Sequence, residues 1–168
     1  MILAGYERVV VLQRQPSTGC VPSAIEWMAR FKGALDPSAY EGFQERFDLT
    51  LQGGTNDFES VAAAVRLVFP QVRVRRIPEV HSADDKLQAI RDFLEKQHPV
   101  VMSLAVPRPG GGAAYHVVPV VEVDSESVTV LWMNSDTIEG QRKRLAISEV
   151  QQLHASHPGG KDLLVWDP

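Results

Sequence analysis

The hydrophobic pattern of this chain changes its period near residue 99, and that change restricts the possible folds more than any other feature. Before it, apolar residues recur at helical spacing, as Ala24, Trp27, Met28 and Phe31 do. After it, β-branched runs such as 100–106 are typical of strands. Helices in one half of a chain and strands in the other predict an α+β fold, in which N-terminal helices pack on a C-terminal antiparallel sheet.

Turn and cap residues divide this pattern into elements. We expect helices at about 20–32, 37–47, 58–69, 83–96 and 148–154. We expect strands at about 8–12, 72–77, 100–106, 115–123, 127–133 and 163–166, and a loop at Gly53–Asn56. The strands at 115–123 and 127–133 would form a hairpin. Because no internal repeat or linker is visible, residues 1–168 are expected to form one domain.

Composition narrows the class of protein. The 168 residues are 44% hydrophobic, which is enough to bury a sizeable core. The net charge of −4 offers no basic surface, so we expect neither nucleic acid nor membrane as a partner. A single cysteine excludes an internal disulfide and fits a reducing compartment. The N-terminus has no leader-like segment and no run approaches about 20 apolar residues, so a cytoplasmic protein is expected.

The single cysteine, Cys20, stands where a polar turn meets the first predicted helix. The positive end of a helix dipole stabilises a thiolate, so this position predicts a lowered thiol pKa and a nucleophile. The alternative is a buried, inert cysteine. Gln15, five residues upstream, could direct its side-chain amide to the same point as the Cys20 N–H and complete an oxyanion hole.

His116 is the best candidate for a general base among the five histidines. It follows a glycine-rich loop and opens a predicted strand, a position exposed enough to titrate and rigid enough to aim. The alternative is a surface histidine without a role. His154 and His157 have the spacing of two metal ligands, but Pro158 and the lack of a third ligand nearby disfavour zinc. We therefore expect no metal and no cofactor.

The predicted hairpin supplies a partner for this histidine. A hairpin pairs the start of one strand with the end of the next, so His116 should meet the region 133–136. Asn134, or as a second choice Asp136, could accept a hydrogen bond from the imidazole and fix its tautomer. Either residue could instead be an ordinary turn residue.

The order Gln15, Cys20, His116, Asn134 resembles that of papain-like cysteine peptidases. The segments Gln15–Ala24 and Tyr115–Val118 are most similar to the compact bacterial branch that contains the bacteriocin leader-peptide peptidases. The resemblance implies a Cys nucleophile, a His base, an Asn or Asp orienter and a Gln in the oxyanion hole.

The chain departs from that branch at three points. Val21 stands where the branch has glycine. The glutamine is five residues before Cys20 at Gln15, or seven at Gln13, where the family has six. The orienter lies eighteen residues after His116, farther than is usual.

Three functions remain open from the residues alone. The first is hydrolysis of a peptide or isopeptide bond in a peptide or protein substrate, through a thioester on Cys20. An acyl transferase would use the same site with an amine as acceptor. The second is a non-catalytic binding domain that kept the fold, because fold does not imply function. The third is a bacterial toxin-type protein that acts on a host or competitor target.

Overall fold

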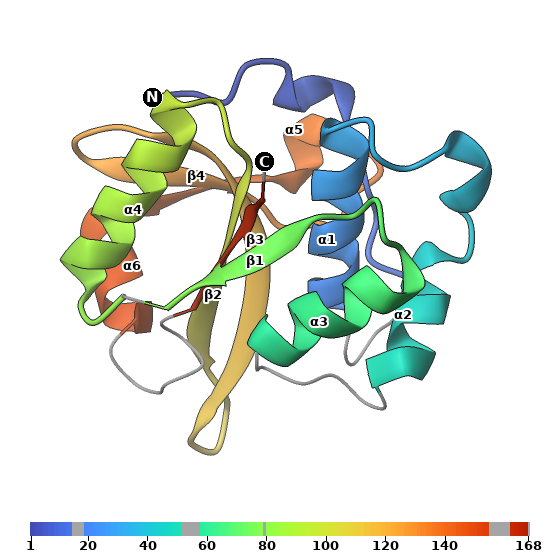
Figure 1. Ribbon diagram of the computed structural model, residues 1–168. Coiled ribbons are helices and arrows are strands. Elements are labelled where there is room, and N and C mark those ends of the chain that lie inside the picture. The colour runs from blue at the N-terminus through green and yellow to red at the C-terminus, as the bar shows by residue number, and fades with distance from the viewer. Residues whose placement is uncertain (15–18, 52–57, 79, 155–161, 168) are drawn as a thin grey trace.

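The computed structural model describes residues 1–14, 19–51, 58–78, 80–154 and 162–167 (Figure 1). Gln15, the loop at Gly53–Asn56, and His157 with Pro158, all named above, lie outside the described residues. None of the helices within these ranges is long and apolar enough to cross a bilayer.

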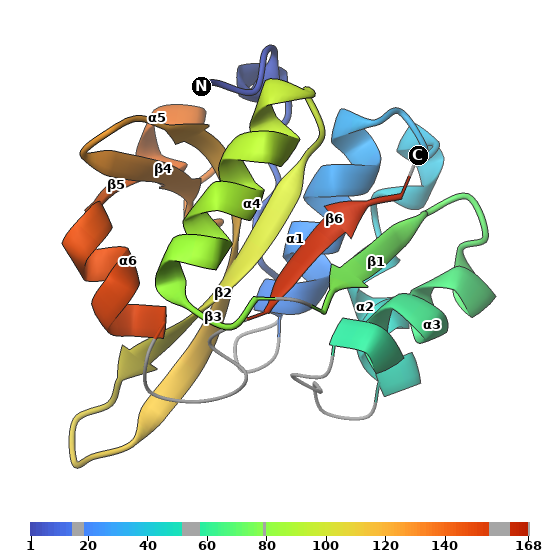
Figure 2. The ribbon, with the colours of Figure 1, turned by 60° about the vertical axis from the view of Figure 1, so that its left-hand side comes forward.

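Six antiparallel strands form one sheet in the order β1-β6-β2-β3-β4-β5. The strands are β1 (Val74–Ile77), β2 (Val100–Pro107), β3 (Ala113–Val123), β4 (Ser127–Leu131), β5 (Arg142–Ala146) and β6 (Leu163–Trp166). The longest pairing joins β2 to β3 and extends to Pro107 and Ala113, so this hairpin protrudes from the molecule (Figure 2).

Two groups of helices flank the sheet. The first group consists of α1 (Cys20–Phe31), α2 (Phe43–Leu51) and α3 (Phe58–Val68), and the second of α4 (Ala83–Glu95) and α6 (Ile147–His154). Figures 1 and 2 show the groups on opposite sides of the strands, with the short α5 (Ile138–Gln141) near the N-terminal segment. The predicted α+β fold, with N-terminal helices on an antiparallel sheet, is confirmed.

The first predicted strand, 8–12, is wrong. Tyr6–Arg8 form a short 3₁₀ helix, Val9 is extended, and residues 9–14 belong to no strand. Side chains take the place of a neighbouring strand here. The carbonyl groups of Val9, Val11 and Leu12 accept hydrogen bonds from the side chains of Trp27, Gln141 and Gln44. An apolar run can satisfy its backbone in this way, which the sequence pattern does not reveal.

Two other predictions need correction. The helix expected at about 37–47 is divided into a 3₁₀ turn at Pro37–Ala39, capped by Asp36, and the helix α2. Gly42, at a φ of 84°, separates the two. The helix α5 and the strand β5 were not expected. β5 is an edge strand in which only Leu145 is buried, so it lacks the apolar alternation that predicts strands.

The helix α1 is the centre of the first group. Its residues 21–29 are all buried, so it is covered on every side except at its ends. Trp27 is fully buried, stacks on Phe31 at 5.4 Å between ring centroids, and donates from Nε1 to the carbonyl oxygen of Val9. Packing on all sides fixes the position of Cys20 at the start of this helix.

Replacing Trp27 by alanine tests this role. The substitution opens a large cavity and leaves the Val9 carbonyl without its donor, so we expect the free energy of unfolding to fall by about 3–5 kcal/mol. Leu67→Ala is the control, because Leu67 is 84% exposed and should change stability by less than about 0.5 kcal/mol. Urea denaturation measures both. Equal losses in the two variants would show that α1 is not a core helix.

Candidate active site

The thiol of Cys20 lies against an open edge of the sheet. β4 pairs with β3 only from Val120 onward, so the preceding residues of β3 have β2 on one side and no strand on the other. The start of α1 fills this side. The Cys20 Sγ lies 4.0 Å from the carbonyl oxygen of Tyr115, to which the thiol donates, and it also faces the N–H of Val117. Its two contacts on β3 therefore flank His116.

Burial decides the protonation state of this thiol. The N–H groups of Val117, Val21 and Cys20 itself stabilise a thiolate and lower the pKa, as expected at a helix start. Loss of solvent around Cys20 is the larger effect, and the pKa of the thiol is raised above its ordinary value. The predicted lowering of this pKa is therefore wrong for the structure at rest.

The ring of His116 is held by its neighbours and is neutral. It packs against Trp132 at 4.3 Å between ring centroids. Burial, and secondly the positive charge of Lys143, lower the pKa of His116 to about 4. Its Nε2 is buried and has no hydrogen-bond partner among the described residues. A buried polar nitrogen without a partner is costly, so this atom marks a place where a partner is needed.

His116 and Asn134 line one pocket of about 390 Å³. Its other walls come from Trp132, Met133 and the segment Leu12–Gln13. The register of the β3–β4 hairpin brings His116 and Asn134 together, because Val120 lies opposite Val130 and the two strands run antiparallel. Asn134 and Asp136 are both exposed, but Asp136 is not among the lining residues. The structure thus brings Asn134, but not Asp136, to the pocket that contains His116.

A strained residue shapes the wall between Trp132 and Asn134. Met133 is fully buried and adopts a φ of 60°, a left-handed conformation that costs about 1–2 kcal/mol for a residue with a side chain. Its carbonyl oxygen accepts a 2.8 Å hydrogen bond from the N–H of Gln13. This bond ties the segment before α1 to the end of the hairpin. Such strain is typical of functional sites, where surrounding contacts maintain it.

A buried carboxylate holds the segment that carries Gln13. Glu26 of α1 is fully buried and pairs with Arg14 at 3.2 Å and with Arg30. It also accepts from the Nε2 of Gln44 at 2.8 Å. Gln44 in turn accepts from the N–H of Arg14 and donates to the carbonyl of Leu12, each at 2.9 Å. The backbone is therefore fixed on both sides of Gln13.

Hydrogen bonds between the candidate residues themselves are not formed. No hydrogen bond joins the Cys20 thiol to the His116 ring, and none joins this ring to Asn134. All three residues are within the described part of the chain. A raised thiol pKa and a lowered imidazole pKa leave both groups uncharged at neutral pH. The arrangement suits general-base activation of a thiol better than a resting ion pair.

Sequence reasoning missed two residues that act on His116. Trp132 falls in the strand expected at about 127–133, where its position favours packing and leaves a substrate groove as the alternative. Only the structure shows that it packs against the imidazole. Lys143 has its Nζ 4.1 Å from the centroid of the Trp132 ring, on a strand that the sequence did not predict. No signal in the charged segment Arg142–Arg144 distinguishes it from an ordinary surface strand.

Comparison with known proteins supports the fold but not a family. Neither a family model nor a curated protein matches this chain. Among solved structures, the chain is similar to a crystal structure from Bacillus anthracis described as a "putative C39-like peptidase". The TM-score is 0.65 and the sequence identity 11%, over 100% of this chain and 98% of that one. The chain therefore shares the fold of that structure, which agrees with the papain-like fold that the sequence resemblance implies.

The charge of Lys143 should be measurable at His116. We expect Lys143→Gln to raise the pKa of His116 above about 4, although burial keeps it below the unperturbed value of about 6.5. Titration of the His116 ring protons by NMR measures the shift. Lys32→Gln, an exposed lysine at the far end of α1, is the control. An unchanged pKa in Lys143→Gln would leave burial as the only cause.

The same titration has a consequence for stability. Because the pKa of His116 is lower in the folded chain than in the unfolded chain, the unfolded chain binds more protons between about pH 4 and 6.5. The free energy of unfolding should therefore rise with pH across this interval. In Lys143→Gln the pKa of His116 in the folded chain should be higher, so the pH interval over which the free energy of unfolding rises should be narrower.

Proposed function

We propose that this protein is a cysteine peptidase-like hydrolase with Cys20 as nucleophile and His116 as general base. One observation supports it above the others. The thiol at the start of α1 contacts the backbone of β3 on both sides of His116. A peptide or protein is the proposed substrate, cleaved at a peptide or isopeptide bond.

The protonation states define the first step. With both groups neutral, His116 takes the thiol proton as Sγ attacks the substrate carbonyl carbon. The resulting oxyanion collapses to a thioester on Cys20, and the imidazolium gives its proton to the leaving amine. A water, deprotonated by His116, then attacks the thioester and releases the carboxylic acid and the thiol.

The oxyanion would form beside the first turn of α1. The N–H of Cys20 is one donor, because the first residue of a helix has no acceptor for it within the helix. Gln13 is the second donor we propose, since it lines the pocket with His116 and its backbone is fixed on both sides. Gln15 is the alternative donor that the family spacing equally allows.

Asn134 is proposed to orient the base. Its amide oxygen can accept a hydrogen bond from the buried Nε2–H of His116, which leaves the lone pair of Nδ1 free to take the thiol proton. The bond is absent at rest, so we propose that it forms when substrate fills the pocket. Catalytic hydrogen bonds that are long or absent without substrate often form in the complex with substrate.

A narrower assignment rests on the sequence resemblance alone. The segments around Cys20 and His116 resemble the bacteriocin leader-peptide peptidases, so a short peptide segment of a larger precursor is a fitting substrate. The raised thiol pKa and the missing Cys20–His116 bond favour one other candidate, a binding domain without catalysis. Acyl transfer differs from hydrolysis only in the acceptor.

A peptide library tests the proposal. Peptides from a bacterial proteome are incubated with the wild type, Cys20→Ala and His116→Ala, and new termini are identified by mass spectrometry. We expect cleavage by the wild type alone, with kcat/KM on the best peptide reduced by at least about 10²-fold in His116→Ala. No new termini with any peptide, from protein that is folded, would favour the binding domain.

The choice of orienter has its own test. We expect Asn134→Ala to lower kcat/KM by at least about tenfold and to change KM little, because Asn134 acts on the base rather than on the substrate. Asp136→Ala is the matched control and should keep full activity, since Asp136 is exposed as Asn134 is but does not line the pocket. The reverse result would make a carboxylate the orienter.

A further inference from the structure

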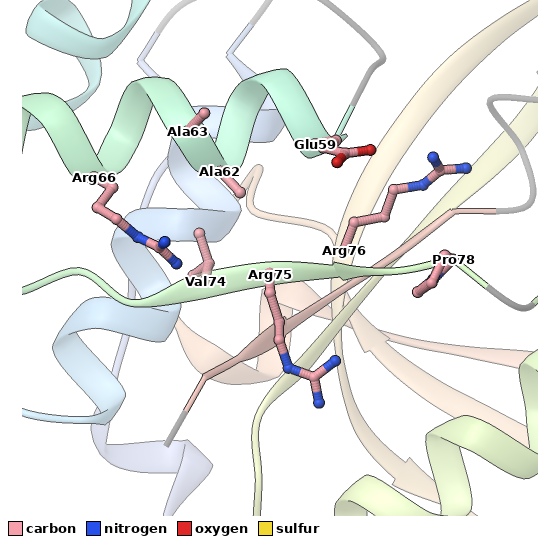
Figure 3. Close-up of a pocket in the computed structure, with 8 residues that line it drawn as sticks. All are labelled: Glu59, Ala62, Ala63, Arg66, Val74, Arg75, Arg76 and Pro78. Carbon is pink, nitrogen blue, oxygen red and sulfur yellow. The ribbon is translucent and has the colours of Figure 1, made fainter.

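A second hollow lies between α3 and the edge strand β1, and Cys20 is not among the residues that line it. It measures about 300 Å³. Figure 3 shows Ala62 and Ala63 of α3 above Val74 of β1, and these small side chains leave the space open. Arg66 reaches down from α3, while Arg75 and Arg76 project to opposite faces of the strand. Glu59, at the start of α3, lines the hollow as well. The hollow is therefore apolar between Ala62 and Val74, with three arginines and one carboxylate around it.

The edge beside this hollow offers free backbone groups. β1 is the first strand of the sheet and pairs only with β6. The carbonyl of Arg73 accepts from the N–H of Asp167 across that pair, so the peptide groups of Arg73 and Arg75 face β6. Because successive residues alternate, those of Val74 and Arg76 face outward. In the described structure no hydrogen bond reaches these outward groups.

The charges at this edge are only partly neutralised. Asp167 is shared, since it lies 3.3 Å from Arg75 and 3.9 Å from Arg66. Asp162 pairs with Arg76 at 3.0 Å. Arg73 is exposed and has no ion pair among the described residues. Four arginines against the carboxylates of Glu59, Asp162 and Asp167 leave one positive charge at this edge, on a chain with a net charge of −4.

The two faces of β1 would favour different side chains on a segment that pairs with it. On the side of α3, a neighbouring strand would meet the alanines of the hollow over Val74, with Arg76 and Glu59 at one end. On the other side it would lie beside Arg73 and Arg75, because residues two apart share a face. A strand that alternates apolar and acidic residues fits both faces at once.

We propose that this edge binds an extended segment of a partner protein in which acidic and apolar residues alternate. The segment adds to the sheet beside β1, with hydrogen bonds to Val74 and Arg76. A second copy of this chain fits poorly, because antiparallel pairing of two β1 strands would place arginines opposite arginines. The proposal does not depend on Cys20 or on the proposed hydrolysis.

Fluorescein-labelled nine-residue peptides test the proposal by anisotropy at low salt. One alternates Glu and Val, one alternates Lys and Val, and one has the Glu–Val sequence with alternate amides N-methylated. We expect saturable binding of the Glu–Val peptide alone, with shifts of the Val74 and Arg76 amide signals in NMR. Equal binding of the N-methylated peptide, or no binding of the Glu–Val peptide, would overturn the proposal.

Two matched double variants locate the site. Arg73→Glu with Arg75→Glu should weaken Glu–Val binding by at least about tenfold. Lys32→Glu with Arg108→Glu makes the same change in net charge at exposed positions elsewhere and should leave binding unchanged. Thermal melting confirms that each variant is folded. Equal weakening by both pairs would overturn the proposal in favour of non-specific attraction.

A third variant tests the hollow without altering charge. Ala63→Leu fills the space at an exposed position and should weaken the Glu–Val peptide, whereas Cys20→Ala should bind it as the wild type does. Unchanged binding by Ala63→Leu would overturn the placement of the bound segment over the hollow. A concentration-dependent dimer that Ala63→Leu dissolves would assign the edge to a second copy instead.

Discussion

The contact between the start of α1 and the open edge of β3 is the constraint on which the candidate site depends. It exists because β4 joins β3 only from Val120, so that the residues around His116 lack a strand on one side. The buried helix α1 fills that side and brings Cys20 to it. Segments nearly a hundred residues apart in sequence thus meet. The helix contributes Cys20 and the hairpin contributes His116, so the candidate site needs both.

Burial, rather than the helix dipole, sets the charge state of the proposed catalytic pair. It raises the pKa of Cys20, although three backbone N–H groups stabilise the thiolate and lower that pKa. Together with Lys143, burial lowers the pKa of His116. A water-poor site keeps both groups neutral until a substrate carbonyl is present to accept the charge. In this account, activation of the thiol and attack on the substrate are one step. The resting protein is accordingly less reactive than an ion pair would be.

Much of this architecture is predictable from the sequence, and the failures have physical causes. The helix from Cys20 and the hairpin around 124–126 follow from periodicity and turn residues, and hairpin pairing alone predicts that His116 meets Asn134. The false strand at 8–12 fails because distant side chains satisfy its backbone. The effect of Lys143 on His116 is invisible because it depends on a charged edge strand and on burial, which only the assembled fold determines.

Acylation of the single cysteine by a small activated ester tests the central claim most directly. With p-nitrophenyl acetate, the acetyl group moves to Sγ of Cys20 as p-nitrophenolate leaves, and mass spectrometry of the intact chain and its peptides locates it. We expect one acetyl group on Cys20 in the wild type, formed at least about 10²-fold more slowly in His116→Ala. Equal rates in the two proteins, or acylation at another residue, would contradict the assignment of Cys20 and His116 as a catalytic pair.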